Sequence, residues 1–195
     1  MSTSNSEMKR RTIQAGEYRM VWDYWAAHAE HFPEREAIVH WDVLGRPFRW
    51  TYGRLYRAAL QVSRRLADRG VKKGDVCALL IRHHRQFYPA YMGIAALGAI
   101  PAVLAYPNPR LHPDKFKQGL TGMAKHSGLD WMVTERALVS QLRPLLKMNP
   151  GTLRGIIPWT SLWRKGTGHR VPIQDPARWR GEVGESDPFL LQHKV

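Results

Sequence analysis

The feature that most constrains the fold of this chain is a repeated alternation of short apolar runs with longer helical segments. The first run, residues 76–81, is entirely apolar, and a continuous run of this length is typical of a strand buried on both faces of a parallel sheet. The predicted strands cover 76–81, 100–105, 131–134 and 155–159, and the predicted helices cover 86–98, 114–127 and 135–147. Strands that alternate with helices form right-handed βαβ units. We therefore expect an α/β fold with a mostly parallel, doubly wound sheet and flanking helices.

The segments before this alternation predict a helix, a hairpin and a second helix. Apolar and aromatic residues recur at helical spacing over 17–31, and two β-prone runs at 37–41 and 48–51 are separated by a turn-rich link. Thr51 is placed to cap an amphipathic helix over 52–69.

The pattern dissolves after residue 159. We expect an irregular connection over about 160–187, followed by one more strand over 188–192. The first residues, 1–16, are expected to form a flexible polar and basic N-terminus, and 17–195 a partial α/β domain.

Size and cysteine content narrow the class of protein. A chain of 195 residues can bury a core without disulfides or a structural metal. Its single cysteine, Cys77, lies in the first apolar run and is expected to be a buried thiol, so no disulfide framework or cysteine zinc site is possible. The longest apolar stretch, 88–106, is cut by proline and glycine, which argues against a transmembrane segment. No secretory signal is apparent, and we expect a cytoplasmic location.

The chain is strongly basic, with Lys+Arg 30 against Asp+Glu 16 and a formal net charge of +14. On the predicted helix 52–69, one face is apolar and the other carries a stripe of arginines: Arg54, Arg57, Arg64, Arg65 and Arg69. Such a stripe is usually a solvated face, and no nucleic-acid-binding motif accompanies it, so we expect no specific nucleic-acid partner. As an alternative function to an enzyme, the positive charge allows a basic interaction module that binds an acidic partner, namely a carrier protein, a membrane surface or nucleic acid.

Polar residues that follow the predicted strands are the candidate lining of a substrate pocket, because ligands of open α/β sheets collect beyond the carboxyl ends of the strands. These residues are His83, His84, Tyr106 and His193. Two adjacent histidines cannot point the same way from a regular element, so they predict no metal site. No nucleophile elbow, Walker loop or zinc-protease motif occurs. We therefore assign no catalytic, cofactor-binding or metal-ligating residue.

Several segments in series resemble the N-terminal part of the AMP-dependent acyl-adenylating ligases, the group that contains fatty acyl-CoA synthetases, fatty acyl-AMP ligases and peptide-synthetase adenylation domains. Residues 32–39 are similar to the family's opening strand, and T-Y-x-x-L at 51–55 followed by 66–76 is similar to its next conserved stretch. Residues 91–103 match the step from a helix into a strand, with Gly93 and Gly98 as scaffold residues. The resemblance spans roughly residues 22–193.

The resemblance implies an incomplete N-terminal domain of an adenylate-forming enzyme, whose family uses ATP, Mg²⁺ and often coenzyme A. In the family, a strand like 188–193 leads into a loop of the type S-S-G-T-T-G-x-x-K that holds the ATP phosphates, whereas here only Lys194 and Val195 follow. We therefore expect a fragment of a ligase that activates a carboxylate, in particular a fatty acid, as acyl-AMP for transfer to coenzyme A or a carrier protein. The fragment is expected to have no cofactor site of its own and to be inactive alone.

The expected partners follow from the same resemblance. They are the remainder of the ligase or an acyl carrier protein. A sheet that lacks neighbouring strands also exposes unpaired backbone groups, which predicts self-association through its edge.

Overall fold

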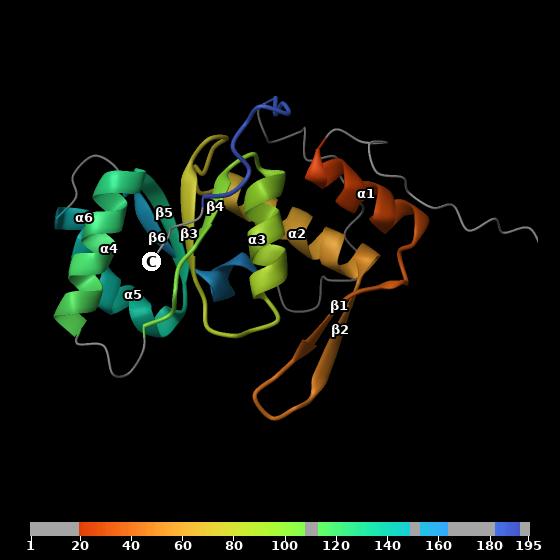
Figure 1. Cartoon of the computed structure of the whole chain (residues 1–195), viewed down its shortest axis with the longest axis horizontal. Coiled ribbons are helices and arrows are strands. Elements are labelled where there is room, and N and C mark those ends of the chain that lie inside the picture. The colour runs from red at the N-terminus through yellow and green to blue at the C-terminus, as the bar shows by residue number, and fades with distance from the viewer. Residues whose placement is uncertain (1–19, 108–112, 149–152, 164–181, 192–195) are drawn as a thin grey trace, which may run out of the picture.

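The computed structural model describes residues 20–107, 113–148, 153–163 and 182–191 (Figure 1). Its centre is a sheet of four parallel strands in the order β4-β3-β5-β6. The strands are β3 (Val76–Leu80), β4 (Ile100–Val103), β5 (Leu129–Thr134) and β6 (Gly155–Pro158). Because β4 and β5 lie on opposite sides of β3, the direction of winding reverses between β3 and β5. The doubly wound α/β fold predicted from the sequence is confirmed.

Helices cover both faces of this sheet (Figure 1). One face is covered by α2 (Tyr52–Ala67) and α3 (Phe87–Ala96), and the other by α4 (Pro113–Ser127), α5 (Arg136–Leu142) and α6 (Leu145–Met148). Strand β3 explains the two layers, because its side chains alternate between the faces. Cys77 and Leu79 pack in the α2–α3 layer, and Leu80 packs in the α4–α5 layer. All three side chains are buried, as the continuous apolar run predicts.

The N-terminal elements form a third apolar cluster beside α2. Helix α1 (Val21–His31) packs against α2, and Trp22 stacks on Tyr56 with ring centroids 4.8 Å apart. Strands β1 (Glu36–Trp41) and β2 (Pro47–Thr51) pair antiparallel, as predicted, and the hairpin extends away from the body of the molecule (Figure 1).

Helix α2 begins and ends as the sequence predicts, within two residues. The Thr51 hydroxyl accepts a hydrogen bond from the Arg54 backbone N–H at 3.4 Å, and Gly70 follows with a φ of 88° that suits a chain reversal after a helix. Part of the predicted arginine stripe binds within the molecule. Arg65 and Arg69 both donate to the backbone carbonyl of Ser161, which ties α2 to the turn that follows β6.

Three expectations about elements need correction. Of the predicted strand 188–192, residues 188–190 form no strand, Leu191 forms an isolated parallel bridge to Ala102 through the Leu191 N–H and the Pro101 carbonyl, and residue 192 lies outside the described residues. The predicted helix 135–147 is interrupted between α5 and α6, where Pro144 supplies no backbone N–H. The connection expected to be irregular begins with a short 3₁₀ helix, Trp159–Leu162.

The ends of the predicted domain fall partly outside the described residues. Residues 1–16, most of the connection 160–187, and His193 belong there. The expected domain boundaries therefore stay predictions.

Candidate functional site

Three polar side chains meet where the winding of the sheet reverses. Arg82 and Glu135 follow β3 and β5, and Tyr106 follows β4. The Glu135 carboxylate accepts from the Arg82 backbone N–H and from the Tyr106 hydroxyl, each at 3.1 Å. The Arg82 guanidinium in turn donates to the Tyr106 hydroxyl at 3.1 Å and lies 4.6 Å from the centroid of that ring. The carboxyl ends of three strands are therefore joined by one small network.

This network is satisfied within itself. The hydrogen bond to Tyr106 and the electrostatic interaction with it, and after them the negative charge of Glu135, raise the pKa of the Arg82 guanidinium, which stays cationic. Both carboxylate oxygens of Glu135 already accept a hydrogen bond. The arrangement fixes the loops after β3, β4 and β5, and it can present a positive charge to a ligand above the sheet.

His84 lies at the same edge. Its Nδ1 accepts a hydrogen bond from the Gln86 backbone N–H at 3.1 Å, so that this nitrogen carries no proton. Its ring lies 4.7 Å from the ring of Trp159, which follows β6. Burial, and next the positive charge of Arg85, lower the pKa of His84, so the ring is neutral at neutral pH.

His83 points the other way, toward the hairpin. Its Nε2 hydrogen-bonds to the backbone carbonyl of Trp41 at 2.8 Å, and its ring stacks on His40 with centroids 4.3 Å apart. Of the four residues predicted to line a pocket, the structure thus brings His84 and Tyr106 to the carboxyl edge and places His83 against the hairpin. His193 lies outside the described residues.

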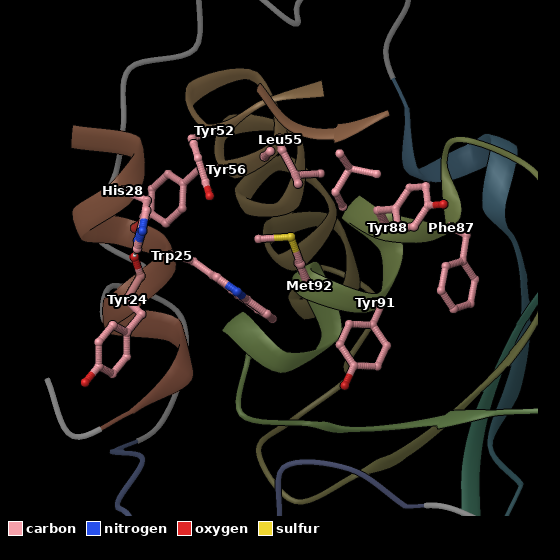
Figure 2. A pocket seen from close by; sticks show the side chains of 12 residues that line it. Tyr24, Trp25, His28, Tyr52, Leu55, Tyr56, Phe87, Tyr88, Tyr91 and Met92 are labelled. Atoms are coloured by element: carbon pink, nitrogen blue, oxygen red, sulfur yellow. Dashed lines mark hydrogen bonds between the residues drawn. The ribbon is translucent and has the colours of Figure 1, made fainter. Parts of the chain in front are cut away.

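A separate pocket opens between the helices α1, α2 and α3 and the base of β1 (Figure 2). Its volume is about 450 Å³. The lining is dominated by aromatic rings, and it comprises Tyr24, Trp25, His28, Ala37, Ile38, Tyr52, Leu55, Tyr56, Phe87, Tyr88, Tyr91 and Met92. Sequence reasoning missed this pocket. The signal available was the concentration of tyrosines, because five of the chain's seven tyrosines belong to this lining.

The described part of the chain holds no group of three or more histidine, cysteine, aspartate or glutamate side chains that could bind a metal ion. A search of the same residues finds no helix with the length and apolar character needed to cross a bilayer.

The strand order defines the class of the molecule as a doubly wound α/β domain, a class in which ligands commonly collect beyond the carboxyl ends of the strands at the switch point. The AMP-binding enzyme family matches residues 25–162, which is more than half of the sequence. The chain belongs to the AMP-binding enzyme family, and the resemblance found in the sequence is confirmed.

The similarity of the chain to individual proteins agrees with this family assignment. The chain is 27% identical to 4-coumarate–CoA ligase 3 of Arabidopsis thaliana over 146 residues, which cover 72% of this chain and 24% of that protein. Among solved structures, a fatty acyl CoA synthetase of Mycobacterium tuberculosis has a TM-score of 0.64 at 22% identity and covers 91% of this chain and 33% of that one. A fatty acyl-adenylate ligase from L. pneumophila has a TM-score of 0.62 at 16% identity and covers 86% of this chain and 26% of that one. This chain therefore spans between 24% and 33% of the length of these relatives.

Proposed function

We propose that this chain forms the N-terminal, sheet-building part of an ATP-dependent ligase that activates a fatty acid as its acyl-AMP, for transfer to coenzyme A or a carrier protein. The observation that carries the proposal is the coincidence of the family match with the parallel sheet: residues 25–162 contain all four strands and the switch point. The similarity to fatty acyl-activating enzymes supports a fatty acid as the substrate.

We propose that the described residues do not form a complete site for the nucleotide and magnesium that this family uses. Mg²⁺ is usually bound through one or two carboxylates together with phosphate oxygens, and the network at the switch point contains one carboxylate, Glu135, which also accepts hydrogen bonds from Arg82 and Tyr106. The sequence also contains no serine- and threonine-rich glycine loop of the type that surrounds phosphates. We therefore assign no adenylation step to these residues and propose that the 195 residues alone do not catalyse it.

Pyrophosphate exchange tests this proposal. The purified chain is incubated with ATP, Mg²⁺, labelled pyrophosphate and dodecanoate, and we expect incorporation into ATP at the level of the blank without protein. Incorporation that depends on dodecanoate would contradict the proposal that the chain is inactive alone.

A chimaera tests the ligase role itself. Residues 25–162 replace the matching segment of the L. pneumophila fatty acyl-adenylate ligase, and circular dichroism establishes that the chimaera is folded. We expect exchange activity to be retained in the folded chimaera. Its complete loss would contradict the proposal that this segment performs the family's scaffold role.

The alternative of a basic interaction module stays a prediction. It draws support from the net charge of +14, and salt-dependent binding to an acyl carrier protein would favour it.

A further inference from the structure

The pocket between α1, α2, α3 and β1 has an unusual lining for a chain in which 24% of residues are charged. Among the described residues that line it, none is an aspartate, glutamate, lysine or arginine. Burying a charged group without a partner costs several kcal/mol or more. The part of a ligand that enters this pocket is therefore uncharged.

Contacts between lining rings, and with rings behind them, hold the aromatic walls of the pocket in place. Trp22, behind the wall, stacks on Tyr56. The rings of Phe87 and Tyr91 stack with their centroids 6.3 Å apart. The ring centroid of Phe189 lies 6.0 Å from that of Trp25 and 6.2 Å from that of Tyr91. Because rings held by contacts with neighbouring rings lose little freedom when a ligand binds, the pocket is largely formed in advance. Figure 2 shows Trp25 reaching from α1 toward Met92 on α3, with Tyr52 and Tyr56 on α2 beside them.

We propose that this pocket binds a planar, uncharged aromatic ligand that carries hydroxyl or carbonyl groups at its edge. A volume of about 450 Å³ lies in the range of small-molecule sites. Flat rings stack on other aromatic rings at centroid distances of about 4.5–7 Å, which gives an aromatic ligand an advantage over a flexible acyl chain. A quaternary ammonium ion also binds aromatic walls, but the net charge of +14 opposes the approach of a cation.

The lining offers polar atoms for the edge of such a ligand. His28 Nδ1 donates to the Tyr24 backbone carbonyl at 2.7 Å, so Nε2 is the ring nitrogen that can accept a hydrogen bond from a ligand. Burial raises the pKa of the Tyr91 hydroxyl, which therefore remains a hydrogen-bond donor at neutral pH. One acceptor and one donor at an aromatic surface match a phenolic or carbonyl-bearing ring.

Isothermal titration calorimetry of the full chain with 2-naphthol tests the proposal. We expect saturable binding at one site.

Ala37→Phe places a ring inside the cavity, and we expect it to abolish binding. Val43→Phe adds the same side chain at the exposed hairpin tip, and we expect it to leave binding unchanged. Trp25→Leu removes a wall and should weaken binding about tenfold, which corresponds to about 1.4 kcal/mol. Circular dichroism of each variant separates lost binding from lost folding.

Two further probes test the chemical class. We expect 1-octanol and tetramethylammonium to bind more weakly than 2-naphthol. The proposal is overturned if 2-naphthol does not bind the wild-type chain, if folded Ala37→Phe binds it with unchanged affinity, or if either probe binds more tightly. The inference does not depend on adenylation, so its failure leaves the pyrophosphate result unaffected.

Discussion

Cys77 is the residue at which sequence and structure agree most directly. Its side chain is fully buried in β3. Burial, and next the negative charges of Asp75 and Asp130, raise the pKa of the thiol far above its usual range. Since the thiolate is the reactive form, we expect the folded protein to resist iodoacetamide at mildly alkaline pH and to react readily in guanidinium chloride. Mass spectrometry measures the adduct.

A matched control places a thiol on the surface. The side chain at position 43 is 86% exposed, so Val43→Cys should add one rapidly reacting thiol to the folded chain. Equal rates of Cys77 modification with and without denaturant would contradict the buried assignment.

Two neutral histidines make stability depend on pH. Burial, and next the charge of His83, lower the pKa of His40, and burial and then Arg85 lower that of His84. The unfolded chain therefore binds protons at a higher pH than the folded chain does. The stability from these two rings is fully present above the ordinary value of 6.5 and is lost as the pH falls through their lowered pKa values.

Urea unfolding between about pH 8 and about pH 5 measures this dependence. We expect the free energy of unfolding to fall with decreasing pH, and a double variant, His40→Gln with His84→Gln, to show a shallower slope. His31→Gln, at the end of α1, serves as the control and should retain the wild-type slope. A double variant with the wild-type slope would refute the assignment to these rings.

The contact between helices α2 and α3 depends on the absence of a side chain. A Cβ atom built at Gly93 would lie 2.7 Å from Val62 Cβ and 2.8 Å from the Ala59 carbonyl oxygen. The two helices would have to separate, so we expect Gly93→Ala to lower the free energy of unfolding by about 1–3 kcal/mol. Chemical denaturation measures the loss.

Gly119 on α4 provides the matched control, because a Cβ there meets no atom of the described residues within 4 Å. Alanine favours the helix at such a site, and Gly119→Ala should raise the free energy of unfolding by roughly 0.5–1 kcal/mol. If both variants destabilised the protein equally, the close approach at Gly93 would not be the cause.

The predicted and observed strands and helices show which parts of the fold follow from local sequence patterns. The strands and helices from residue 76 onward were predictable because apolar runs and helical periods are local patterns. The run ending at Leu191 is apolar, but a strand also requires a partner that continues the ladder, and within the described residues Leu191 forms one such hydrogen bond, to Pro101. The aromatic pocket was not predictable in the same way, since its walls come from four elements that only the tertiary fold brings together.

The candidate site also contains some residues that the sequence could place and others that it could not. The sequence places Tyr106 and His84 after strands, and this suffices to predict that they lie at the carboxyl edge. It does not reveal that Glu135 is the centre of the hydrogen-bond network, or that His83 turns to the hairpin. Both depend on loop conformation and on side-chain partners far away in the chain, at Arg82 and Trp41.

At the scale of the whole molecule, exposed apolar side chains gather beside the edge strand β4. Val103 is 45% exposed, and Leu190, next to the bridge between Leu191 and Ala102, is 46% exposed. Apolar side chains at a sheet edge favour pairing between chains. We propose that the protein self-associates here, and we expect Val103→Lys with Leu190→Lys to lower the oligomer fraction in sedimentation velocity.

The control carries lysines at the hairpin tip, Val43→Lys with Leu44→Lys, where the apolar side chains are also exposed. It should leave the oligomer fraction at the wild-type level. A wild-type chain that remains monomeric over the concentration series would refute self-association at β4.

Residues 182–191 contact residues that lie much earlier in the sequence. Lys73 Nζ donates to the Glu182 carbonyl, 109 positions later in the sequence, and pairs with Asp187 at 2.8 Å. Val183 occupies the space beside Gly98, where a Cβ would lie 2.7 Å from its Cγ2. During synthesis on the ribosome, α1 and α3 emerge long before residues 182–191 are translated, so the apolar side chains of α1 and α3 that Phe189 contacts, Trp25 and Tyr91, stay uncovered until then. Nascent chains stalled short of residue 182 should therefore be better chaperone substrates than those released beyond residue 191.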